Sequence, residues 1–161
     1  MRSLLTDGLL FALIMRPSIF GIAILSLAQS AMACQWKQRP TEEIVAGAKS
    51  IFRARVTEVK LLEPRPPALD RYPKVFEAVE ARYDVLETFK GEPPSAGIVR
   101  DFMFAPGNCS LGLFPGWEYI FIPDSDGMVP LPTGSFGYFN REAKAVKPRI
   151  DEIRDLTRTK Q

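Results

Sequence analysis

Hydrophobic and polar residues alternate along several stretches of the chain, as they do in strands that bury one face. From 51 to 60 the alternation places Phe52, Ala54 and Val56 on one face, with basic or hydroxyl residues on the other. A longer stretch from 75 to 89 alternates in the same way, and a period of two residues predicts strands. We therefore expect strands at 51–60, 75–89, 98–104 and 117–122, with a fifth that starts within 128–131.

Two stretches, one before and one after the predicted strands, are expected to be helical. Ile150, Ile153 and Leu156 recur at intervals of three, which predicts an amphipathic helix near the C-terminus. Residues 40–47 are typical of a short helix with Thr41 as its N-cap, because threonine often caps a first turn and two glutamates follow it. The expected fold is mainly β, with a short N-terminal helix and a C-terminal amphipathic helix.

Turn-forming residues separate these elements. Several prolines within 62–73 predict an exposed loop, and we expect residues 134–139 to be irregular. Asp124-Ser125-Asp126-Gly127 predicts a hairpin turn, because aspartate and glycine are preferred there. A calcium loop is the alternative for this stretch, but it needs a bidentate glutamate that does not follow within reach.

The first 33 residues are mainly apolar and end in Ala31-Met32-Ala33. Small residues at the first and third of these places are what signal peptidase recognises, so we expect a signal peptide that is cleaved before Cys34. Translation would begin at Met1 or at Met15, because charged residues interrupt a single long apolar run. A retained membrane anchor is a less favoured alternative, since the apolar run is short for a membrane span. A lipid-modified Cys34 is also less favoured, because Ala31 and Met32 match a lipoprotein signal poorly and Cys109 would be left as a lone thiol.

The composition excludes several kinds of function. The chain has no histidine, so it can form neither a catalytic triad with a histidine base nor a zinc site with imidazole ligands. The formal net charge is +2, and this near balance gives no reason to propose nucleic acid as a partner. Acidic residues within 77–87 interleave with apolar ones on a predicted strand, so we interpret them as a solvated face rather than as paired catalytic carboxylates. We expect no enzymatic activity and no cofactor.

Cys34 and Cys109 are the two cysteines of the chain. Two cysteines in an exported protein predict one disulfide. One interpretation is a structural clip that closes a long loop. The other concerns the new N-terminus, where a neutral α-amine and the carbonyl oxygen of the same residue can chelate a zinc ion in a five-membered ring. A disulfide would hold that amine rigidly, which lowers the entropic cost of binding.

Five short stretches, in their order along the chain, resemble the netrin-type fold of the tissue inhibitors of metalloproteinases. They are Cys34, Ala48–Val56, Tyr83–Gly91, Asn108-Cys109-Ser110 and Gly116–Phe121. The resemblance implies a five-stranded OB-type barrel with flanking helices and a terminal cysteine that chelates the zinc of a partner protease. It places Cys34 on the metal through its backbone amine and carbonyl, and Gln35 in the specificity pocket. Asn108 and Ser110 would flank the cleft of the protease.

These observations give a signal peptide at 1–33, an OB barrel of the inhibitor type at 34–140 and a helical extension at 141–161. The expected function is inhibition of a zinc metalloprotease through Cys34, by a secreted or periplasmic protein. The alternative is a non-catalytic binding or structural module of the cell envelope that shares only the OB fold, since OB barrels host many ligands. We expect no stable membrane insertion after cleavage.

Overall fold

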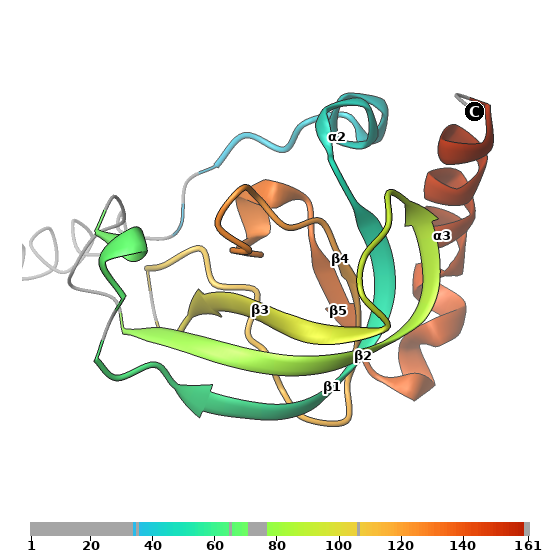
Figure 1. Ribbon diagram of the computed structural model, residues 1–161. Helices are drawn as coiled ribbons and strands as arrows, with labels where there is room; N and C mark the ends of the chain where they lie inside the picture. The colour runs from blue at the N-terminus through green and yellow to red at the C-terminus, as the bar shows by residue number, and fades with distance from the viewer. Residues whose placement is uncertain (1–33, 35, 65, 71–76, 106, 160–161) are drawn as a thin grey trace, which may run out of the picture. The chain divides into compact units, whose positions relative to one another are not determined.

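Five antiparallel strands form one sheet in the computed structural model of this protein (Figure 1). The structure describes residues 34, 36–64, 66–70, 77–105 and 107–159. The strand order is β3-β2-β1-β4-β5, so the first strand lies in the middle. The strands are β1 (Ile51–Leu61), β2 (Ala78–Lys90), β3 (Ala96–Phe102), β4 (Glu118–Phe121) and β5 (Phe136–Tyr138).

Helices flank this sheet near both ends of the described chain. They are α2 (Thr41–Gly47) and α3 (Ala143–Arg158), with short 3-10 turns η2 (Pro67–Leu69), η3 (Leu131–Thr133) and η4 (Asn140–Glu142). Residues 34–161 form one compact unit. The expected mainly β fold, with a short helix before the sheet and a longer helix after it, is confirmed.

The two long strands form where the alternating pattern predicts them. β1 pairs with β2 along its whole length, from Ile51 opposite Lys90 to Leu61 opposite Val79. The register shifts at several points along this pairing, and such irregularities bend and twist a strand. Both strands curve strongly (Figure 1), so one pair of strands can enclose a core on its concave side.

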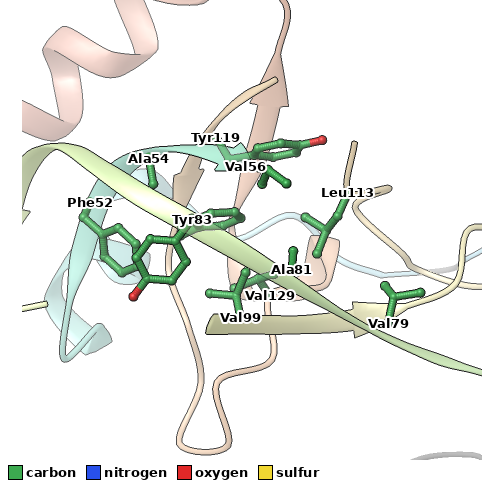
Figure 2. Packing of buried hydrophobic residues seen from close by; sticks show 11 residues of the cluster. Phe52, Ala54, Val56, Val79, Ala81, Tyr83, Val99, Leu113, Tyr119 and Val129 are labelled. Carbon is green, nitrogen blue, oxygen red and sulfur yellow. The ribbon is translucent and has the colours of Figure 1, made fainter. Parts of the chain in front are cut away.

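One hydrophobic core lies on the inner side of this curve, and we call it the sheet core. Figure 2 shows its side chains pointing toward one another from β1, β2, β3, β4 and the loops. Aromatic rings fill its centre, with ring centroids 5.0 Å apart for Phe52 and Tyr83 and 5.2 Å apart for Tyr119 and Phe121. Its buried members are Phe52, Ala54, Val56, Val79, Ala81, Tyr83, Val99, Leu113, Tyr119, Phe121 and Val129.

A second hydrophobic core lies between the sheet and the two helices. Ile150 and Ile153 of α3 are buried in it and Leu156 packs against it, so the helical spacing seen in the sequence identifies the packed face of this helix. Arg154 ties α3 to β2, because its guanidinium donates two hydrogen bonds to the Glu87 carboxylate at 2.9 and 3.1 Å. The C-terminal helix is therefore an integral layer of the fold.

Several local predictions are wrong. Thr41 is the first residue of α2 rather than its cap, and the capping residue Pro40 makes no side-chain hydrogen bond. The proline-rich stretch is not wholly exposed, because Leu69 is buried against Met128 and other residues. The carboxylate of Glu80, expected on a solvated face, is buried between Lys60 and Arg100 at 3.2 and 3.5 Å.

The fifth strand lies later in the chain than expected. It is β5, within the stretch predicted to be irregular, and Gly137 at its centre stands opposite Tyr119 of β4. A Cβ atom on Gly137 would lie 2.3 Å from the Tyr119 ring, so this pairing requires glycine. The predicted fifth strand contributes a single bridge instead, in which Met128 pairs in parallel with Arg100 of β3.

Candidate functional site

A disulfide joins Cys34 to Cys109, as the sequence predicts. The two Cα atoms lie 5.1 Å apart and the bond closes a separation of 75 residues. Both cysteines are partly exposed. The residue that would become the new N-terminus is therefore fixed to a distant loop at the surface.

The loop that carries Cys109 is held by hydrogen bonds on both sides of the cysteine. The Asn108 side-chain amide donates to the Met103 carbonyl at 2.7 Å, and its oxygen accepts the Ser110 N–H at 3.2 Å. The Cys109 carbonyl accepts the N–H of Leu131 at 2.9 Å. These contacts fix the backbone of this loop against two other segments, so it can act as a rigid support for Cys34.

A buried carboxylate, Asp101 at the end of β3, organises the next part of the loop. Its side chain is 0% exposed. One oxygen, Oδ1, accepts the N–H of Phe102 at 2.8 Å, while Oδ2 accepts the N–H of Leu111 at 2.7 Å and that of Gly112 at 3.3 Å. Oδ2 also lies 2.9 Å from the Ser110 hydroxyl. A single side chain thus connects the sheet to three successive residues after Cys109.

The Ser110 hydroxyl lies between two possible hydrogen-bond acceptors. The Ser110 hydroxyl lies 2.9 Å from Asp101 Oδ2 and 2.8 Å from the Phe102 carbonyl, and it accepts the Gly112 N–H at 3.0 Å. A hydroxyl has one proton to donate, so Ser110 donates either to Asp101 Oδ2 or to the Phe102 carbonyl. The N–H groups of Phe102, Leu111 and Gly112 donate to the Asp101 carboxyl group in either case, and such bonds favour its ionised form.

Burial and hydrogen bonding shift the pKa of Asp101 in opposite directions. Burial raises the pKa of Asp101 to about 6, although the hydrogen bonds from Phe102, Ser110, Leu111 and Gly112 lower it. Desolvation disfavours the charged form of an acid and is the largest cause here. The carboxyl group therefore changes its charge in the mildly acidic range, far above the ordinary range of aspartate.

Tyr119 supports the far end of the same loop. Its hydroxyl donates to the Gly112 carbonyl at 2.8 Å and accepts the N–H of Phe114 at 2.8 Å. Burial raises the pKa of Tyr119 to about 12, so its phenol stays neutral and able to donate. Gly112 has φ +72°, and a Cβ atom there would lie 3.3 Å from the Phe114 ring, so this tight turn favours glycine.

An exposed apolar surface lies beside this turn. Phe104 and Phe114 flank Gly112, and their side chains are 69% and 46% exposed. Met103, whose carbonyl holds Asn108, is also exposed at 46%. Together we call Met103, Phe104 and Phe114 the loop aromatic surface, since the two rings dominate it. Exposed apolar clusters of this kind mark contact surfaces for other molecules more often than single exposed residues do.

The structure brings together most of the residues that the sequence proposes for a site. Cys34, Asn108 and Cys109 meet at one edge, whereas Gln35 lies outside the described residues. Ser110 belongs to the same loop, but its side chain is 4% exposed and turned toward Asp101. The hydroxyl supports the loop from within, and a contact between Ser110 and a partner stays a prediction. Asp101 itself was not proposed from the sequence.

The chain matches no protein-family model, and no curated protein matches it. Its resemblance to the metalloproteinase inhibitors therefore rests on the short stretches described above. In the part of the chain that the structure describes, no three acidic or cysteine side chains gather into a group that could hold a metal ion. No helix within those same residues is both long and apolar enough to cross a membrane.

Proposed function

We propose that the chain, once cleaved before Cys34, inhibits a zinc metalloprotease by presenting its terminal amine and carbonyl to the catalytic metal. The observation that carries this proposal is the attachment of Cys34 to a loop that is itself fixed from within by Asp101. A chelating group that is held in place before binding loses little conformational freedom on binding. The disulfide, the Asn108 contact and the Asp101 contacts all favour such a fixed edge.

The chemistry of this terminus suits a metal that keeps one open coordination position. A free α-amine has a pKa of roughly 8, so a substantial fraction is neutral between pH 7 and 8. The neutral amine and the carbonyl oxygen of Cys34 would then occupy the metal in place of water. The partner supplies the zinc, and this chain contributes no metal of its own.

The loop aromatic surface supports a protein partner rather than a small ligand at this edge. Phe104 is the most exposed large apolar side chain of the part of the chain that the structure describes. Aromatic residues and methionine are enriched in protein interfaces. Met103, Phe104 and Phe114 would pack beside the protease cleft while Cys34 engages the metal.

We further propose that the sheet closes as an OB-type barrel and that the protein is exported. The parallel bridge supports closure, because the Arg100 N–H donates to the Gly127 carbonyl and the Val129 N–H donates to the Arg100 carbonyl, both at 2.9 Å. These bonds place the segment after β4 along the free side of β3. The disulfide supports an oxidising compartment, either outside the cell or in the periplasm.

Adding one alanine before Cys34 should abolish inhibition, because the extra residue moves the amine away from the metal and fills the cleft. The measurement is an inhibition assay against a panel of zinc proteases, with the protein that begins at Cys34 and the extended form. The same alanine added after Gln161 is the matched control and should leave inhibition unchanged. Equal inhibition by both N-terminal forms would contradict chelation. No inhibition of any protease would favour the binding-module alternative.

A further inference from the structure

A cavity of about 470 Å³ has Cys109 in its lining and none of the three residues of the loop aromatic surface. Its walls come from α2 and the residues next to it, from the end of β3, and from the segments 122–124 and 130–133. Phe102 lines this cavity and also a smaller one of about 190 Å³, whose lining includes Phe104 and Phe114. Small-molecule sites commonly have volumes of about 300–1,000 Å³, so the larger cavity is within that range.

The walls of this cavity are apolar and rigid. Ile44 of α2, Phe102 and Ile122 supply buried apolar surface. Three prolines also line the cavity, at positions 123, 130 and 132, and proline fixes its own φ angle. The disulfide holds Cys109 in the wall. A ligand would therefore meet a site that exists before it binds, which keeps the entropic cost low.

Two polar side chains of the lining, those of Thr133 and Asp124, already make hydrogen bonds within the protein. The Thr133 hydroxyl donates to the Pro130 carbonyl at 2.8 Å. The Asp124 oxygen Oδ1 accepts the N–H groups of Asp126 and Met128 at 2.8 and 3.0 Å, which commits this carboxylate to its turn.

The Arg39 guanidinium differs from these two groups. Its Nη2 donates to the Pro132 carbonyl at 3.2 Å, and its Nη1 lies 4.0 Å from the Glu43 carboxylate. A guanidinium has five N–H donors in a planar fork that matches a carboxylate. Its side chain is 45% exposed, so Arg39 forms part of the rim of the cavity rather than its floor.

We propose that this cavity binds a small molecule that has an apolar body and one carboxylate, with the carboxylate paired to Arg39. The apolar walls select the body, and the cation at the rim selects the charge and the orientation. Cys34 is not among the residues that line the cavity, so ligand binding there does not require protease inhibition. The same chain would then carry a ligand site and a protease-binding edge that share one disulfide.

Gly47 offers a way to close the cavity without straining the fold. It lines the cavity at the end of α2, and a Cβ atom placed on it meets nothing within 4 Å. A leucine there would extend into open space at the cavity mouth, and leucine is also a better helix former than glycine. Gly47→Leu should therefore keep the protein folded while it blocks the ligand.

The test measures the binding of octanoate, octanol and octylammonium to the full mature protein by calorimetry or by NMR titration. Octanoate should bind most tightly and octylammonium most weakly. Arg39→Gln should weaken octanoate about fivefold, as for a half-exposed ion pair, and should leave octanol unchanged. Arg82→Gln, on the exposed face of β2, is the matched control and should change none of the three.

Gly47→Leu should abolish binding of all three compounds without lowering the melting temperature, while Gly47→Ala should weaken it only slightly. Three results would overturn the proposal: octylammonium binding as tightly as octanoate, binding that survives Gly47→Leu, or no binding of any compound to the parent protein. If Gly47→Leu fails to fold, the Arg39→Gln comparison between octanoate and octanol decides the matter alone.

Discussion

Replacing Cys34 and Cys109 together by serine should lower the free energy of unfolding by about 4.5 kcal/mol. The bond closes a separation of 75 residues, and without it the unfolded chain gains the entropy of that loop. The folded state should change little near the sheet core, because neither cysteine belongs to it. Urea denaturation of the two proteins at the same pH measures the difference.

A reducing agent provides the control for this prediction. It should lower the stability of the parent protein to that of the double serine variant and leave the variant itself unchanged. A difference below about 1 kcal/mol between parent and variant would contradict a disulfide in the native protein. The double variant should also lose inhibition, since Cys34 would no longer be tied to Cys109.

Asp101→Leu should destabilise the protein by about 3 kcal/mol. The substitution removes the acceptor of the Leu111 N–H and the side-chain acceptor of the Phe102 N–H. It also removes one of the two acceptors of the Gly112 N–H, which keeps the Ser110 hydroxyl. Each buried donor without a partner costs about 1–3 kcal/mol. Asp101→Asn should cost less, because the amide keeps the shape of the acid and one of its acceptor oxygens.

Asp101 should also make the free energy of unfolding decrease as the pH rises through the mildly acidic range. The pKa of Asp101 is raised from 3.8 to about 6 in the folded protein, so folding favours the protonated acid. Its stabilising effect is complete below about pH 3.8 and is lost as the pH rises through about 6. The interval corresponds to roughly 3 kcal/mol, so the parent protein should lose stability relative to Asp101→Asn between pH 4 and pH 7.

The free energy of unfolding is plotted against pH for the parent and for Asp101→Asn. Subtracting the second curve from the first removes the effect of the other carboxylates. Asp84→Asn, on an exposed position of β2, is the matched control and should follow the parent at every pH. Denaturant unfolding at several pH values supplies the curves. Parallel curves for the parent and Asp101→Asn would show that the buried acid does not change its charge in this range.

The long strands could be predicted because their pattern is local. Phe52, Ala54 and Val56 alternate with polar residues on β1 and are all buried in the sheet core. The helix α3 follows in the same way from the spacing of Ile150 and Ile153, which are both buried. Where an element is long enough to repeat its period several times, burial can be inferred from sequence.

The short strand β5 could not be predicted because three residues do not establish a period. Its central Gly137 is explained only by the Tyr119 ring opposite it, and the two residues are far apart in sequence. The stretch from 128 to 131 has the composition of a strand, yet it pairs with β3 through Met128 alone. Whether each of these two stretches forms a strand therefore depends on residues that are distant in the sequence.

The role of Asp101 was missed although the sequence carries a signal for it. Side chains two residues apart on a strand share a face, so Asp101 lies on the same face as Val99, which is buried in the sheet core. A charged residue at a core position is unusual and needs partners. Those partners, Ser110 to Gly112, lie in a loop about ten residues later, and no local pattern connects them to the strand.

The cavity beside Cys109 could not have been inferred from sequence at all. Its walls come from segments around residues 44, 102, 122 and 132, which are joined only by the folded sheet and the disulfide. Arg39 and Gly47 carry no motif that marks them in the sequence. By contrast, the pairing of Cys34 with Cys109 follows from the cysteine count and the predicted signal peptide.

The most direct test of the proposed inhibitor edge is the affinity of the protein that begins at Cys34 for one zinc protease, measured with and without the catalytic zinc. The comparison uses a protease that the panel identifies as inhibited. If the Cys34 amine and carbonyl bind the metal, zinc removal should weaken binding at least tenfold, a change of about 1.4 kcal/mol. The alanine-extended form should bind both states of the protease equally and weakly. Equal affinity of the Cys34 form for the zinc-loaded and zinc-free protease would contradict the account.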